Sequence, residues 1–148
     1  MRRLTRLQER FVNSVEFSVP GEPCAKGRPR FNRATGHAVT PSKTGRYEFI
    51  VRLSYMQQIG QSVQLEGPLS AEISAYFTIP KSASKKKRQQ MLDGELHPTK
   101  KPDTDNLAKI VLDALNGIAY ADDKDIVRLN VKKIWSEQPR VDVKISRI

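Results

Sequence analysis

Residues 103–117 read DTDNLAKIVLDALNG, and the interpretation of the whole chain starts from this stretch. Its apolar residues recur at spacings of three and four, and they are Leu107, Ile110, Val111, Ala114 and Leu115. This period predicts an amphipathic helix over residues 103–116 that turns one face to a core. Gly117 is expected in the C′ position, where glycine commonly ends a helix.

The segments on both sides of this helix alternate apolar and polar residues, a pattern typical of half-buried strands. Residues 15–19 predict one strand, which ends at a Pro-Gly turn, and residues 69–79 predict another. Residues 126–135 and 140–145 flank the short sequence Glu-Gln-Pro, so they predict an antiparallel hairpin.

Two further helices are expected. Residues 41–59 carry a helical period between Pro41 and Gly60, and residues 81–92 form a short basic segment with little apolar face. Residues 24–40 are rich in glycine, proline and cations, which indicates a loop or irregular hairpin. The fold class predicted is α+β, with a small mixed β-sheet and helices packed against it.

The chain has 148 residues, of which 38% are hydrophobic, enough for one core but not for two. We therefore expect a single domain over residues 15–148, preceded by a basic arm or short helix over residues 1–14. Cys24 is the single cysteine, which excludes an internal disulfide framework and favours a reducing, cytoplasmic compartment. The basic start is not followed by an apolar stretch, so a secretory signal is not expected.

The net charge of +10 favours an anionic partner. Nucleic acid is preferred over a membrane because no segment is apolar enough to span a bilayer. Against this background, residues 103–125 contain six aspartates and only two lysines, a local charge of −4. Carboxylates that face a polyanion are best explained by hard divalent cations, which bridge carboxylate and phosphate oxygens. The sequence therefore predicts a metal-dependent phosphoester site.

Simpler explanations of the same residues stay open. Asp103 and Asp105 flank a helix start, where acidic groups also cap backbone N–H groups. Asp105, Lys109 and Asp113 follow at intervals of four and would form a salt-bridge ladder. The helix extends about 18 Å from Asp105 to its end. The segment from Gly117 to Asp123 spans roughly 20 Å when extended. Asp122 or Asp123 therefore reaches the helix start only if that segment runs back along the helix. An EF-hand is rejected, since its required glycine and glutamate positions are occupied by alanines.

The motifs taken together resemble a known family. Residues 101–109 read KPDTDNLAK, residues 113–117 read DALNG, residues 122–126 read DDKDI, and residues 20–31 include PGEP and KGRPRF. These closely resemble the signature of RusA-type Holliday junction resolvases of bacteria, phages and prophages. The resemblance covers residues 15–145. It implies a homodimeric, Mg²⁺-dependent endonuclease, with Mn²⁺ as a possible substitute, that makes paired nicks in four-way DNA junctions during recombination and repair.

The resemblance also implies the roles of particular residues. Asp103, Asp105 and Asp123 are expected to bind the metal, and Lys109 to stabilise charge that develops on the scissile phosphate. The cations expected to bind DNA phosphates without reading sequence are Lys26, Arg28, Arg30, Lys85, Lys86, Lys87 and Arg88. Two rival functions are a non-catalytic nucleic-acid-binding module of the same fold and an inactive relic of the family. The presence of all four expected catalytic residues argues against the relic.

Overall fold

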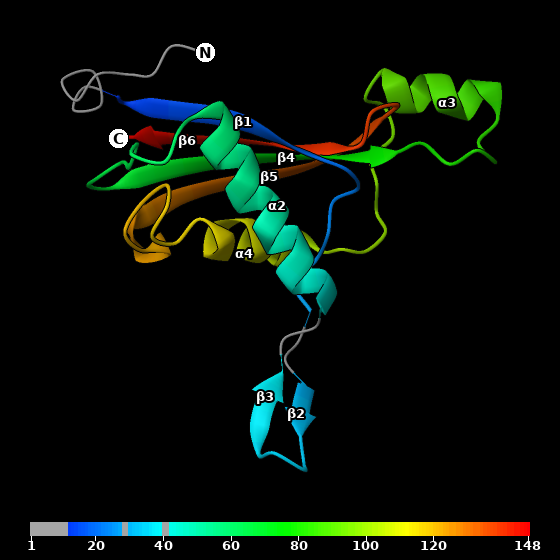
Figure 1. Cartoon of the computed structure of the whole chain (residues 1–148). Helices are drawn as coiled ribbons and strands as arrows, with labels where there is room; N and C mark the ends of the chain where they lie inside the picture. The colour runs from blue at the N-terminus through cyan, green and yellow to red at the C-terminus, as the bar shows by residue number, and fades with distance from the viewer. Residues whose placement is uncertain (1–11, 28–29, 40–41) are drawn as a thin grey trace.

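A four-stranded mixed sheet forms the centre of the molecule (Figure 1). In the computed structural model, which describes residues 12–27, 30–39 and 42–148, its strand order is β1-β6-β4-β5. The strands are β1 (Ser14–Pro20), β4 (Leu69–Thr78), β5 (Ile126–Ser136) and β6 (Arg140–Arg147). β6 pairs antiparallel with β1 and with β4, whereas β4 and β5 run parallel.

The alternation of residues along each strand decides which face of the sheet is buried. Val15, Phe17 and Val19 of β1 are buried while the residues between them are more exposed, and β4 alternates in the same way from Leu69 to Phe77. The buried apolar side chains of β1 and β4 therefore collect on one face of the sheet. The opposite face carries charged and polar residues.

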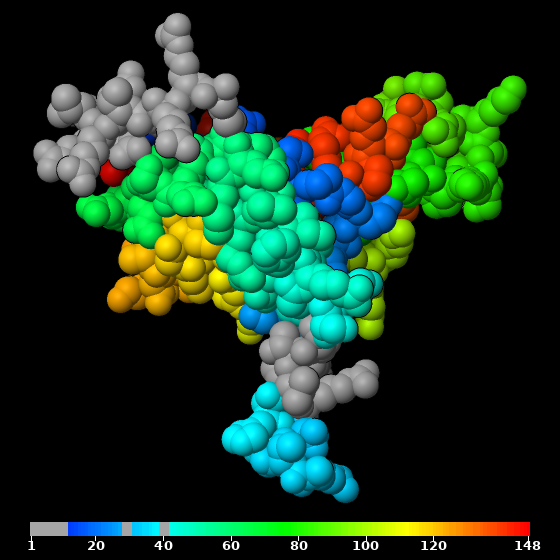
Figure 2. All heavy atoms as spheres, in the orientation of Figure 1, coloured from blue at the N-terminus to red at the C-terminus, as the bar shows by residue number. Residues whose placement is uncertain are grey.

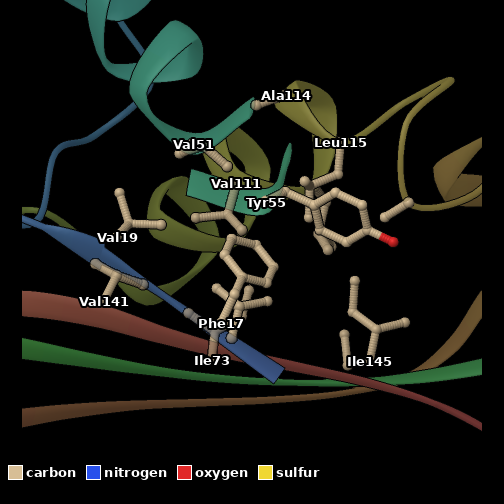
Figure 3. Close-up of a cluster of buried hydrophobic side chains, with 14 of the residues drawn as sticks. Phe17, Val19, Val51, Tyr55, Ile73, Val111, Ala114, Leu115, Val141 and Ile145 are labelled. Carbon is tan, nitrogen blue, oxygen red and sulfur yellow. The ribbon is translucent and has the colours of Figure 1, made fainter. Parts of the chain in front are cut away.

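Two helices cover the apolar face. They are α2 (Ser42–Gln58) and α4 (Thr104–Ala114), which lie against the same side of the sheet (Figure 1). Tyr47, Val51 and Tyr55 are buried at helical spacing along α2. The resulting core is shown in Figure 3, where Val51 and Tyr55 of α2 and Val111 of α4 approach Phe17 of the sheet. The Phe17 and Tyr55 rings meet edge to face, with their centroids 5.3 Å apart.

Two elements lie outside this core. α3 (Lys85–Leu92) has no buried residue and is capped by Ser84, whose side chain accepts a hydrogen bond from the Lys87 N–H. The strands β2 (Arg30–Asn32) and β3 (His37–Val39) form a small antiparallel hairpin. Figure 2 shows this hairpin in cyan, projecting from the body of the molecule.

The α+β class, the mixed sheet and the order of elements are confirmed. The predicted hairpin of residues 126–135 and 140–145 is wrong, because β4 lies between β5 and β6 and pairs with both. The helix predicted over residues 103–116 ends earlier, since Leu115 is its C-cap and Asn116 occupies the C′ position. Gly117 comes one residue later and has a positive φ of 76°. The helix predicted from residue 81 begins at Lys85.

The N-terminal arm predicted for residues 1–14 falls outside the described residues up to residue 11, and Ser14 already belongs to β1. Among the described residues, no helix is both long and apolar enough to span a membrane.

The end of α4 is held by a buried tyrosine. The Tyr120 hydroxyl donates a hydrogen bond of 2.6 Å to the Leu112 carbonyl, one of the carbonyls that the helix itself leaves without a partner. Tyr47 is also buried, but its hydroxyl has no partner among the described residues. We therefore expect Tyr120→Phe to lower the free energy of unfolding by about 1 kcal/mol, because it leaves a buried carbonyl unsatisfied. Urea denaturation of the purified protein measures this change.

The matched control is Tyr47→Phe, which removes a hydroxyl that has no hydrogen bond and should leave the free energy of unfolding unchanged or slightly raised. Equal destabilisation by both variants would contradict the role assigned to Tyr120.

Candidate metal and DNA site on helix α4

Asp103 and Asp105 stand at the start of α4, and both are exposed. The burial of Leu107 and Ile110 turns one side of the helix into the core, which leaves the acidic start facing solvent. Asp103 occupies the N-cap position with extended backbone, but its side chain makes no capping hydrogen bond. The carboxylate of Asp103 is therefore not used to cap the helix. Both acids lie at the positive end of the helix dipole, where negative charge stabilises the helix.

Lys109 lies one turn further along the exposed side of α4. Within the described part of the chain, its ammonium forms no ion pair with Asp105 or Asp113. The salt-bridge ladder considered as an alternative is therefore not formed. Lys109 presents an uncompensated positive charge one turn from two exposed carboxylates.

Asp113 has a different environment. Its Oδ2 accepts a hydrogen bond from the Lys26 ammonium, which also lies 3.6 Å from Glu48 Oε1 of α2. Burial alone would lower the pKa of Lys26, but the hydrogen bond and charge of Asp113, followed by those of Glu48, outweigh this effect and raise it. This ion-pair cluster fixes the segment before β2 against α2 and α4.

Asp122 and Asp123 lie in a tight turn after α4, the 3₁₀ segment η1 (Asp123–Asp125). The Asp123 N–H donates to Asn116 Oδ1 at 2.8 Å, and Asp122 Oδ1 accepts from the Lys124 N–H at 2.8 Å. Burial raises the pKa of Asp123, and its hydrogen-bonding contacts with Asp122 and Asp113 raise it further. The pKa of Asp122 is lowered, first by the backbone hydrogen bond from Lys124. Carboxyl groups are thus crowded at this end of the helix.

The two ends of α4 keep the predicted metal ligands apart. Asp123 contacts Asp113, which is about 12 Å along the helix axis from Asp105. The segment after the helix does not run back to the helix start; Asn116 holds it at the helix end. Among the described residues, no group of three acidic, histidine or cysteine side chains is close enough to hold a metal ion. Within a single chain, Asp123 therefore lies at the opposite end of α4 from Asp103 and Asp105.

Comparison with known proteins identifies the family. A family model described as endodeoxyribonuclease RusA matches residues 20–146. The chain belongs to the RusA family. It is also similar to the uncharacterized protein YqaN of Bacillus subtilis (strain 168), with 40% identity over 141 residues that cover 93% of this chain and 99% of the relative. The family predicted from the motifs is confirmed, and membership implies endonuclease activity on DNA.

The cations that are expected to bind DNA in this RusA-family chain differ in exposure and in ion pairing. Lys85, Lys86 and Lys87 are exposed on α3, whereas Arg88 pairs with Glu137 of the turn after β5 at 2.8 Å. Lys26 is paired with Asp113 and Glu48, as described above. Arg28 lies outside the described residues, and Arg30 contributes backbone to β2.

Sequence reasoning missed two residues that shape this RusA-family site. Asn116 positions Asp123 through its side chain, and Glu48 shares Lys26 with Asp113. Asn116 belongs to the conspicuous DALNG motif, but nothing in that motif indicates which backbone group the amide contacts. Glu48 carries no sequence signal, since it comes from a different helix.

The Lys26–Asp113 pair joins residues 87 positions apart, so it should contribute to stability. Both side chains are about a quarter exposed, which moderates the interaction. We expect a double-mutant cycle of Lys26→Met and Asp113→Asn to give a coupling energy of about 1 kcal/mol. The measurement is chemical denaturation of the wild type, the two single variants and the double variant.

Lys43→Met provides a control for the loss of positive charge, since Lys43 has no ion pair in the described part of the chain. Additivity of the two changes at positions 26 and 113 would show that the pair contributes nothing to folding.

Proposed function

We propose that this chain is a Mg²⁺-dependent endodeoxyribonuclease that resolves four-way DNA junctions by paired symmetric nicks, as a homodimer, in recombination and repair. The observation that carries the proposal is the start of α4. In a RusA-family chain, it presents two exposed carboxylates and an unpaired lysine within two helical turns. Metal-assisted hydrolysis of a phosphodiester uses this combination of acidic ligands and a nearby cation.

The donor chemistry fits a hard divalent cation. Asp103, Asp105 and Asp123 offer only carboxylate oxygens, which Mg²⁺ and Mn²⁺ accept. Burial raises the pKa of Asp123, and its contacts with Asp122 and Asp113 raise it further; a bound cation would offset the repulsion among these carboxylates. When bound, the metal would neutralise the scissile phosphate and lower the pKa of the attacking water. Lys109 would stabilise the negative charge that develops on the phosphate oxygens.

A second copy of the chain would complete this ligand set. β5 is an edge strand of the sheet, and it exposes Val127 and Leu129, which are 63% and 45% accessible. An exposed edge of this length is available for pairing with another strand. β5 begins just after Asp123 and ends beside the start of α4, because α4 and β5 run in opposite directions (Figure 1).

Two-fold symmetry then has a direct consequence for the ligands. If β5 pairs antiparallel with β5 of a second copy, the start of each strand lies beside the end of the other. Asp123 of one copy would approach Asp103 and Asp105 of the other, and two equivalent sites would result. Two related sites are what paired cuts in a symmetric junction require.

The proposal predicts how single ligand changes behave. We expect Asp105→Asn and Asp123→Asn each to abolish Mg²⁺-dependent nicking of a labelled synthetic four-way junction. Junction binding should be retained or strengthened, because each change removes one negative charge that faces phosphate. Gel-shift and nicking assays on the same preparations measure both effects. Full nicking by Asp105→Asn would overturn the assignment, and junction binding without any cleavage by the wild type would favour the non-catalytic module.

If each site draws ligands from both copies, two inactive variants should restore cleavage activity when they are combined in one dimer. A mixed dimer of one Asp105→Asn chain and one Asp123→Asn chain keeps one complete ligand set if each site draws on both copies. It keeps none if each site lies within one chain. Co-expression with two different affinity tags isolates the mixed dimer. We expect one nick per junction at up to half the wild-type rate from shared sites, and complete inactivity would refute the sharing.

Lys109 provides a separate test of catalysis. Because its ammonium has no ion pair in the described chain, Lys109→Ala should change stability by no more than a few tenths of a kcal/mol. We expect the single-turnover cleavage rate to fall by roughly 10²–10³-fold, with far smaller changes in DNA affinity. Lys109→Arg should restore activity only in part, since a guanidinium lacks the compact geometry of an ammonium. Cleavage by Lys109→Ala at the wild-type rate would exclude a catalytic role.

A further inference from the structure

Two lysines lie against a pair of aromatic rings at the ends of β4 and β5. The Lys100 ammonium is 5.6 Å from the centroid of the Phe77 ring and 5.5 Å from that of Trp135. The Lys133 ammonium is 5.6 Å from the same Phe77 centroid. The two rings contact each other edge to face, with their centroids 6.5 Å apart. This arrangement, which we call the Lys100/Lys133 cluster, holds two like charges close together.

Neither charge is neutralised by a carboxylate. Among the described residues, Lys100 and Lys133 have no acidic oxygen within 4.0 Å, in contrast to Lys26 and Arg88, which are both ion-paired. Phe77 is buried and Trp135 is half-buried, so the rings cannot move away from the ammonium groups without disturbing the core. Two fixed cations without counter-charges repel each other, and an anion bound between them would relieve that repulsion.

The cluster lies on the path to the predicted catalytic residues. The Lys133 ammonium donates a hydrogen bond to the Lys100 carbonyl, three residues before Asp103. On the other side, the Arg88–Glu137 ion pair attaches α3 to the turn that follows β5. The cluster therefore lies between the exposed lysines of α3 and the acidic start of α4.

We propose that Lys100 and Lys133 form a binding site for a backbone phosphate of the DNA strand that enters the site at α4. This inference rests on the proposed function. Ammonium groups bind phosphate as point charges and do not read sequence. A base-stacking role for Trp135 is disfavoured, since Lys100 already covers a face of the indole ring. The site adds to the phosphate contacts predicted from the sequence, and its Lys100 lies closer to Asp103 along the chain than any of those residues does.

The test measures junction binding in Ca²⁺, without cleavage, over a range of salt concentrations. Lys133→Met keeps the aliphatic stem but removes the charge. We expect it to weaken binding about five- to tenfold at moderate salt. The slope of log K against log[salt] should become shallower by about 1 to 2 per dimer. Lys133→Arg should keep the wild-type slope. Trp135 is the single tryptophan of the chain, so its fluorescence should change when the junction binds.

Lys132→Met is the matched control. Lys132 is the neighbouring residue, but it pairs with Ser74 on the opposite, uncovered face of the sheet, whereas Lys133 shares its face with Phe77. Loss of the Lys132 charge should leave the slope and the fluorescence response at their wild-type values. An unchanged slope in Lys133→Met, or an equal change in Lys132→Met, would overturn the proposal.

A measurement on the wild type keeps the proposal testable if Lys133→Met fails to fold. Iodide should quench Trp135 more strongly than neutral acrylamide does, relative to free N-acetyltryptophanamide, because the cluster attracts anions. Added junction DNA should protect Trp135 from iodide. Equal quenching by the two agents would overturn the proposal. Junction binding and cleavage with no effect at Lys133 would refute this site alone, whereas a wild type that binds no DNA would refute the proposed function as well.

Discussion

The burial of one side of α4 is the constraint on which the rest of the structure depends. Leu107, Ile110 and Val111 are almost completely buried against the sheet. The burial of these apolar side chains stabilises this orientation of the helix by several kcal/mol, on the order expected for three such residues. The helix is consequently unable to rotate, so Asp105 and Lys109 must face solvent. The geometry of the candidate site is therefore a product of core packing, and the acidic residues do not need to hold themselves in place.

Most of the secondary structure could be predicted from the sequence, because each element carries its own period. The neighbour order of the strands could not. Residues 126–135 and 140–145 are joined by a short turn, which favours a hairpin, yet β4 separates them in the sheet. The helices α3 and α4 that connect β4 to β5 indicate a crossover, and a crossover is what a parallel pair requires. That non-local argument outweighs the local turn, because β4 pairs with β5 along one edge and with β6 along the other.

The candidate site likewise has features that the sequence predicts and features that it does not. The exposure of Asp103, Asp105 and Lys109 follows from their position on a helix whose apolar face is visible in the sequence. The contact of Lys26 with Asp113 spans 87 residues, and the position of Asp123 depends on a single amide hydrogen bond from Asn116. Neither contact has a local pattern. The same is true of the Lys100/Lys133 cluster, where the rings come from two strands and one cation from a loop.

The place of β6 in the sheet has a consequence for how the protein is made. β6 pairs with β1 on one side and with β4 on the other, yet the ribosome synthesises it after all three other strands. During synthesis β1 has no neighbour, and β4 has only β5. The apolar face of β1 therefore stays exposed until β6 is synthesised. In this incomplete sheet the strand edges are unpaired, and unpaired edges promote aggregation. The sheet is complete only when β6 pairs with both β1 and β4. Folding of the sheet therefore takes place late in synthesis, after the last strand has been made.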